Sequence, residues 1–270
     1  MTRDNPFEGL AARYQQSRPD YPDELLANVQ RLVVGAQDVP RVLIDVGAGT
    51  GIATRAFRRA LGSDWIITGV EPGLDMRRQA VAATPAEDAI DYIEGDAESL
   101  PVGASSVGVV TVAQAIQFFD RPVFYAESAR VLHTDGALGI LQNNRDWRAS
   151  AVLDAYESYA EANSEGYSRD YRDIDVLGEL AGLDWADPAQ RFEFVWTMPM
   201  TPDRFVAMTL SRRTMKPAVA ALGEAKVTAD LSTLAGDHVD AFGNVQIPYV
   251  SELFVVVKSS RKVISRGTLC

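Results

Sequence analysis

Residues 45–51 read DVGAGTG and place one carboxylate and three glycines directly after the apolar run Val42–Val46. Glycine lets the backbone turn sharply and come close to a ligand that a Cβ atom would exclude. The helical run that follows, Ile52–Leu61, starts with backbone N–H groups that have no partner inside a helix. An apolar strand, a glycine turn and a helix in this order predict a ligand-binding site, with Asp45 beside it.

A second carboxylate, Glu71, follows the glycines by about 20 residues, at the end of the next apolar run. At that spacing a carboxylate can accept both hydroxyls of a ribose. The glycines are spaced G-x-G-x-G, and Ile52 occupies the position where a dinucleotide site has glycine or alanine. The two motifs together favour a nucleoside over a dinucleotide. The alternative is a tight strand-to-helix turn with Glu71 on a solvated edge.

Short β-rich runs alternate with helix-compatible segments, and this alternation predicts a parallel sheet built from βαβ units. The runs are nearly all apolar, which indicates strands covered by helices on both faces. They are Val42–Val46, Trp65–Val70, Ile90–Glu94, Val107–Val112 and Ala137–Leu141. Two later runs, Phe192–Thr197 and Tyr249–Val257, are expected to close the sheet as an antiparallel pair.

The 270 residues are 47% hydrophobic and 23% charged, which is typical of one globular α/β domain with insertions. The polar, tyrosine-rich stretch Tyr156–Tyr171 and the helical stretch Thr201–Leu234 predict a helical cap. The expected division is an N-terminal lid at about 1–35, a core at about 36–145 and 190–260, and a cap at about 146–189 and 201–234.

The formal net charge of -11 repels phosphate backbones, so nucleic acid is a poor candidate partner and a small ligand fits better. The single cysteine, Cys270, excludes a disulfide or a thiolate zinc site within the chain and suits a reducing cytoplasm. No apolar stretch approaches the ~20 residues that span a bilayer. These features predict a cytoplasmic protein with no membrane segment.

Four motifs in order resemble the class I S-adenosylmethionine-dependent methyltransferases, from the first residues to about Lys258. Residues 45–51 resemble the first motif, and Glu71 resembles the acid that binds the ribose, with Met76 packing on the adenine. Residues 93–101, IEGDAESLP, resemble the segment that addresses the adenine edge through Asp96 and Ala97. The resemblance implies a Rossmann-like, seven-stranded, mostly parallel sheet with helices on both faces and a helical cap insertion.

Residues 107–120 resemble the fourth strand and the loop under the sulfonium, and residues 130–136 resemble the lead-in to strand five. Residues 14–22, YQQSRPDYP, resemble the small-molecule branch related to trans-aconitate methyltransferase and methyltransferase type 11 proteins. Relatives often carry histidine and an aromatic residue where this chain has Gln117 and Phe118, so no histidine base is expected there. We interpret the two histidines of the chain, His133 and His238, as structural.

The resemblance and the physics of a sulfonium give the candidate site. Oxygen lone pairs and aromatic faces suit its positive charge, and guanidinium suits a carboxylate on the acceptor. The expected cofactor-binding residues are Tyr14, Asp45, Gly47, Ala48, Gly49, Gly51, Glu71, Pro72, Met76, Asp96, Ala97 and Gln114. The catalytic candidates are Tyr14, Gln117, Asn143 and Asn144, and the substrate candidates are Arg18, Phe118, Asn144, Tyr167, Tyr171 and Arg212. No residue spacing indicates a metal site.

The expected activity is transfer of a methyl group by direct displacement from S-adenosylmethionine to an oxygen, nitrogen or carbon nucleophile of a small molecule. A sulfonium already carries a good leaving group, so alignment of the acceptor and exclusion of water are the main tasks of the protein. Two alternatives remain at this point. One is an enzyme that uses the same cofactor for another reaction, such as a cyclisation, and the other is a non-catalytic nucleoside-binding regulator.

Overall fold

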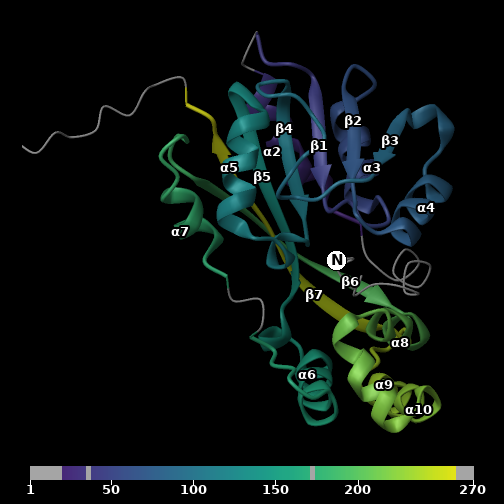
Figure 1. Cartoon of the computed structure of the whole chain (residues 1–270). Helices are drawn as coiled ribbons and strands as arrows, with labels where there is room; N and C mark the ends of the chain where they lie inside the picture. Colours follow the sequence, from purple (N-terminus) through teal and green to yellow (C-terminus); the bar gives the residue numbers. More distant parts are fainter. Residues whose placement is uncertain (1–19, 35–37, 171–173, 260–270) are drawn as a thin grey trace, which may run out of the picture.

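The computed structural model describes residues 20–34, 38–170 and 174–259. They form a seven-stranded sheet in the order β3-β2-β1-β4-β5-β7-β6 (Figure 1). The strands are β1 (Val42–Val46), β2 (Ile66–Val70), β3 (Ile90–Ile93), β4 (Val107–Ala113), β5 (Leu132–Arg145), β6 (Gln190–Met200) and β7 (Val245–Val257). The first five strands are parallel, and β7 is antiparallel to both β5 and β6. This confirms the predicted fold class and the antiparallel closing pair.

Helices cover both faces of the sheet because successive strand residues point to opposite sides. Leu43 packs into a cluster with α2 (Asp23–Val34) and α3 (Ile52–Leu61). Its neighbour Ile44 packs on the other face, with α5 (Arg121–Val131) and α7 (Val176–Ala181). The helix α4 (Leu74–Ala83) lies beside β3. The described part of the expected lid includes α2, whose Leu25 and Leu26 are buried in the core of the sheet.

A third apolar cluster lies beyond the ends of β6 and β7 and forms the helical cap (Figure 1). It contains α6 (Ala151–Asn163), α8 (Pro202–Leu210), α9 (Lys216–Leu222) and α10 (Glu224–Gly236), and it packs on Met200 and Tyr249 from the two strands. The expected cap range 146–189 also includes α7, which instead packs on the sheet. The physical reason is that α5 holds α7 in place: Arg121 and Tyr125 of α5 both donate hydrogen bonds to the Glu179 carboxylate of α7.

The strand β5 is longer than the predicted run Ala137–Leu141. Its last residues are polar and half-buried, so the apolar pattern ends before the strand does. Register with β7 continues to the pair Arg145 and Tyr249, which carries β5 past the edge of the parallel strands toward the cap. Short 3-10 turns follow several elements: η1 (Ala86–Asp88), η2 (Ile116–Phe118), η3 (Trp147–Ala149) and η4 (Arg213–Met215). Among the described helices, none is long and apolar enough to cross a membrane.

Candidate active site

The glycine turn leaves the end of β1 and is fixed to the end of β2. Gly47, Gly49 and Gly51 have φ values of 69, 57 and 78, in the left-handed region that favours glycine. The Gly47 and Ala48 N–H groups both donate to the Val70 carbonyl, at 2.8 and 3.1 Å. The turn therefore sits at the carboxyl edge of the sheet, where doubly wound folds bind ligands.

The three glycines serve different purposes. A Cβ atom on Gly47 would lie 2.7 Å from the Ala115 Cβ, and one on Gly51 would collide with the Tyr92 hydroxyl. These two glycines let the turn pack against the loop after β4 and against β3. A Cβ on Gly49 would meet nothing within 4 Å. Open space beside the turn is therefore found at Gly49, whereas Gly47 and Gly51 are both closely packed.

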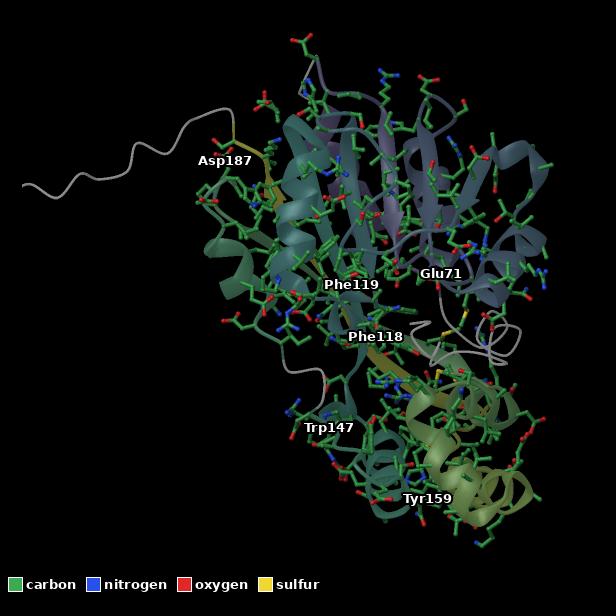
Figure 2. All side chains as sticks on the ribbon, in the orientation of Figure 1. Glu71, Phe118, Phe119, Trp147, Tyr159 and Asp187 are labelled. Atoms are coloured by element: carbon green, nitrogen blue, oxygen red, sulfur yellow. The ribbon has the colours of Figure 1, made fainter. Side chains whose placement is uncertain are left out.

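Glu71 follows β2 and faces the turn. Its Oε2 accepts the Gly49 N–H at 3.0 Å, and its Oε1 accepts the Gly73 N–H at 2.9 Å. Burial raises the pKa of Glu71, and these two N–H groups and Arg77 oppose that rise. Figure 2 shows Glu71 at the end of the sheet that faces the cap. A carboxylate oxygen can accept more than one hydrogen bond, so the same group has capacity left for ribose hydroxyls.

Asp45 has a different place from the one predicted. It is fully buried in β1, where it accepts hydrogen bonds from Thr54 Oγ1 at 2.6 Å and Thr111 Oγ1 at 3.1 Å. Burial raises the pKa of Asp45 to about 7, against the opposing effect of the two hydroxyls. The carboxyl group therefore ties β1 to β4 and α3 beneath the turn.

The buried position of Asp45 predicts a pH-dependent stability. The folded chain keeps a proton on Asp45 up to about pH 7, whereas the unfolded chain releases it near the ordinary value of 3.8. The folded state therefore binds the extra proton and loses stability as the pH rises between these values. We expect the free energy of unfolding of the wild type, minus that of Asp45→Asn, to fall by up to about 1.4 kcal/mol per pH unit from about pH 5 to 7. Urea titrations of both proteins measure it, and a difference that is flat across pH contradicts the assignment.

The segments next to Glu71 supply apolar and polar surfaces. Met76 in α4 and Ala97 after β3 are both buried, with 3% and 7% of their surface exposed. Pro72 and Asp96 are exposed, and the Asp96 carbonyl accepts the Ser99 N–H at 3.2 Å. Of these residues, Asp96 presents an exposed carboxylate, whereas Met76 and Ala97 expose little surface.

The loop after β4 turns sharply at Gln114, which has a φ of 57. The Gln114 N–H donates to the Leu141 carbonyl at 3.0 Å, and its own carbonyl accepts Gln117 Nε2 at 2.9 Å. The Gln117 side chain thus holds the loop through one hydrogen bond of its amide. Phe118 comes next in η2 and is 37% exposed. The Arg213 guanidinium lies 5.1 Å from the centre of the Phe118 ring, so the cap contacts this loop.

The polar end of β5 holds the two predicted asparagines. The Asn143 Oδ1 accepts the Ser251 hydroxyl from β7 at 2.8 Å, and Asn144 Nδ2 donates to Gln142 Oε1 at 3.2 Å. Both side chains are half-buried. Asn143 is therefore held toward β7 by Ser251, and Asn144 is held by its neighbour Gln142.

The cap brings Tyr167 and Arg212 together around Glu157, and sequence reasoning missed two members of this group. Arg145, at the end of β5, contacts Glu157 of α6 at 3.2 Å, and Arg212 contacts the same oxygen at 3.6 Å. The Tyr167 hydroxyl donates to the other Glu157 oxygen. The sequence did offer one sign of this group, because Arg145 lies in the polar segment that follows the predicted strand five. The candidates Tyr14, Arg18 and Tyr171 lie outside the described residues.

Comparisons with known proteins agree with this geometry. The family described as a methyltransferase domain matches residues 44–140, from the glycine turn to β5. The uncharacterized methyltransferase Rv3342 of Mycobacterium tuberculosis is 31% identical over 223 residues, which cover 76% of this chain and 76% of that protein. The chain belongs to the class I S-adenosylmethionine-dependent methyltransferases.

Solved structures show the same methyltransferase fold. A protein from Anaeromyxobacter dehalogenans described as a type II methyltransferase has a TM-score of 0.62 at 20% identity, over 90% of this chain and 97% of that one. Phosphoethanolamine N-methyltransferase 2 of Haemonchus contortus, in complex with S-adenosyl-L-methionine, has a TM-score of 0.52 at 18% identity. That match covers 96% of this chain and 58% of the other.

S-adenosylmethionine is the cofactor of this methyltransferase, and the residues at the turn fit it. The open space at Gly49 leaves room for a group that a side chain would displace. Glu71 keeps acceptor capacity beyond its two backbone N–H partners. Among the described residues, no three or more histidines, cysteines or carboxylates are grouped as a metal site would require.

Proposed function

We propose that this methyltransferase transfers the methyl group by direct displacement to a small-molecule acceptor bound between the glycine turn and the cap. The observation that carries the proposal is the open space at Gly49, next to the Glu71 carboxylate. The net charge of -11 supports a small acceptor over nucleic acid. We expect the protein to act in the cytoplasm, which suits a chain with a single cysteine.

The chain's own residues would bind and orient the cofactor. Glu71 would accept the ribose hydroxyls, and Met76 and Ala97 would cover the adenine, with Asp96 at its polar edge. Gly47, Ala48 and Gly49 would present backbone to the amino-acid part. When bound, S-adenosylmethionine supplies an electrophilic methyl group on a sulfonium. Asp45 and Gly51 would hold the turn in shape and make no contact with the cofactor.

The acceptor would lie against the loop after β4 and the end of β5. Phe118 offers an exposed aromatic face there, and Asn144 offers a half-buried amide. Neither side chain is a base at neutral pH, since an aromatic ring and an amide do not titrate there. Catalysis would therefore come from alignment and exclusion of water. This favours acceptors that are nucleophilic in their resting protonation state.

Product mass tests the proposed reaction. The full chain is incubated with S-adenosylmethionine and a panel of small phenols, amines and carboxylic acids, and the mixture is analysed by mass spectrometry. We expect an acceptor heavier by about 14 Da, the mass of an added CH₂, in step with release of S-adenosylhomocysteine. Consumption of the cofactor with no such product would indicate another reaction on the sulfonium, and binding without any turnover would indicate a regulator.

A further inference from the structure

Arg145 belongs to a cluster of enclosed charged side chains at the cap interface, together with Glu157 and Arg212. Its side chain is 9% exposed, and it sits at the last position of β5, paired in register with Tyr249. Below it lies the ring of Tyr156, whose centre is 4.7 Å from the Arg145 guanidinium. A guanidinium is charged at every physiological pH, so burial of this side chain requires compensation from its surroundings.

The compensation that Arg145 receives is partial. Its Nη2 lies 3.2 Å from Glu157 Oε1, longer than the spacing of a strong charge-assisted hydrogen bond. Glu157 Oε1 also lies 3.6 Å from Arg212 Nη1, and Glu157 Oε2 accepts a hydrogen bond from the Tyr167 hydroxyl. One carboxylate is thus divided between two guanidinium groups and a phenol. It is not a complete counter-ion for Arg145.

One half of the Arg145 fork has no acceptor among the described residues. Its Nη1 is buried and makes no hydrogen bond with any residue that the structure describes. Two hydroxyls near Arg212 along the chain, those of Thr209 and Thr214, are also buried without a hydrogen-bond partner in the described part of the chain. Buried donors of this kind are rare in folded proteins and indicate a group that the site is built to receive.

The position of Arg145 connects it to the acceptor side of the site. β5 follows β4 in the sheet, and Arg145 directly follows the half-buried Asn144. Arg213, next to Arg212, lies on the ring of Phe118 in the loop after β4, at the end of the sheet that faces the cap (Figure 2). The arginines and the aromatic ring thus belong to one interface between the cap and the carboxyl edge of the sheet.

We propose that Arg145, with Arg212 beside it, binds an oxyanion group of the acceptor, so that the substrates of this methyltransferase are small carboxylates or phosphates. A planar guanidinium fork matches both groups through two parallel hydrogen bonds. The net charge of -11 repels anions in general, so an anionic acceptor needs a local positive site such as these arginines to bind. This inference rests on the proposed function and specifies its substrate class.

The test measures anion binding without turnover. The full chain is saturated with S-adenosylhomocysteine and titrated with succinate, inorganic phosphate and uncharged succinamide at constant ionic strength, with the melting temperature and calorimetric heat recorded. We expect saturable binding of at least one of the two anions and none of succinamide. Succinate alone would identify a carboxylate site, and phosphate alone a phosphate site. Saturation by neither anion would overturn the proposal.

Variants assign the binding to Arg145. Arg145→Met keeps the aliphatic stem and should weaken anion binding by roughly tenfold or more, the scale of a charge-assisted pair. Arg41→Met is the control, because Arg41 is an exposed arginine that also pairs with a single carboxylate, Asp64. It should leave anion affinity unchanged. Equal affinity of Arg145→Met and the wild type would overturn the proposal.

Two further variants keep the proposal testable if Arg145→Met fails to fold. Arg145→Lys retains the charge but loses the fork, and it should bind the anion more weakly than the wild type. Glu157→Gln removes the competing carboxylate and should bind the anion more tightly, with a melting temperature that depends more strongly on anion concentration. A purely structural cluster would show neither change. Methyl transfer to a neutral acceptor without anion binding would overturn this proposal and leave the proposed function intact.

Discussion

Gly49→Val is expected to abolish detectable binding of S-adenosylhomocysteine while the chain remains folded. The structure separates the two effects, because a Cβ on Gly49 meets nothing within 4 Å and the core packs beneath the turn. A branched side chain would occupy the open space that the cofactor needs. The φ of 57 adds strain of about 1–3 kcal/mol, which should lower the melting temperature without unfolding the chain. Calorimetric titration and thermal melting by circular dichroism measure the two quantities.

Gly243→Val is the matched control for the strain. Gly243 has a φ of 78, lies in the turn before β7 and also has nothing within 4 Å of an added Cβ. It should lose comparable stability and keep wild-type affinity for S-adenosylhomocysteine. A folded Gly49→Val protein with wild-type affinity would remove the glycine turn from the cofactor site.

The second large effect is expected for Glu71→Ala, which should weaken cofactor binding by roughly 10–100-fold through loss of charge-assisted hydrogen bonds of about 1.5–3 kcal/mol. Part of this loss is indirect, because Glu71 also accepts the Gly49 and Gly73 N–H groups and so shapes the turn. Titration of each protein with S-adenosylhomocysteine measures the change in Kd.

Glu94→Ala is the control for the loss of one negative charge near the same edge of the sheet. The Glu94 side chain is 78% exposed and pairs with Arg77, which also donates to the Glu71 carbonyl. We expect the affinity of Glu94→Ala to stay within about twofold of the wild type, since exposed ion pairs contribute little. If Glu71→Ala behaves like Glu94→Ala, the ribose binds elsewhere.

The fold followed from the sequence wherever burial dictates composition. β1 and β4 are covered on both faces, so their residues are almost all apolar and their ranges were predicted closely. The end of β5 was missed because it leaves the two-sided core and carries polar residues toward the cap. The prediction placed α7 in the cap, whereas it packs on the sheet. Its position depends on Arg121 and Tyr125, which precede Glu179 by more than 50 residues, and no local sequence pattern connects them.

The arrangement of the candidate site was predictable where it depends on the backbone. The glycine spacing and Glu71 follow from the geometry of a tight turn, and they lie together in the structure. The partners of Asp45 were not predictable, since the two threonines come from different elements and only the fold brings them to its carboxyl group. The pairing of Arg145 with Glu157 joins β5 to α6 through tertiary packing, so periodicity and spacing carried no sign of it.

The most direct test of the central claim is a pair of calorimetric titrations of the wild-type chain, one with S-adenosylhomocysteine and one with NAD. S-adenosylhomocysteine stands for the cofactor after methyl transfer and cannot react. Ile52 breaks the dinucleotide spacing, whereas Glu71 retains the ribose carboxylate. The expected result is saturable binding of S-adenosylhomocysteine at one site and no measurable heat from NAD. Saturable binding of NAD with no heat from S-adenosylhomocysteine would contradict the assignment of this site.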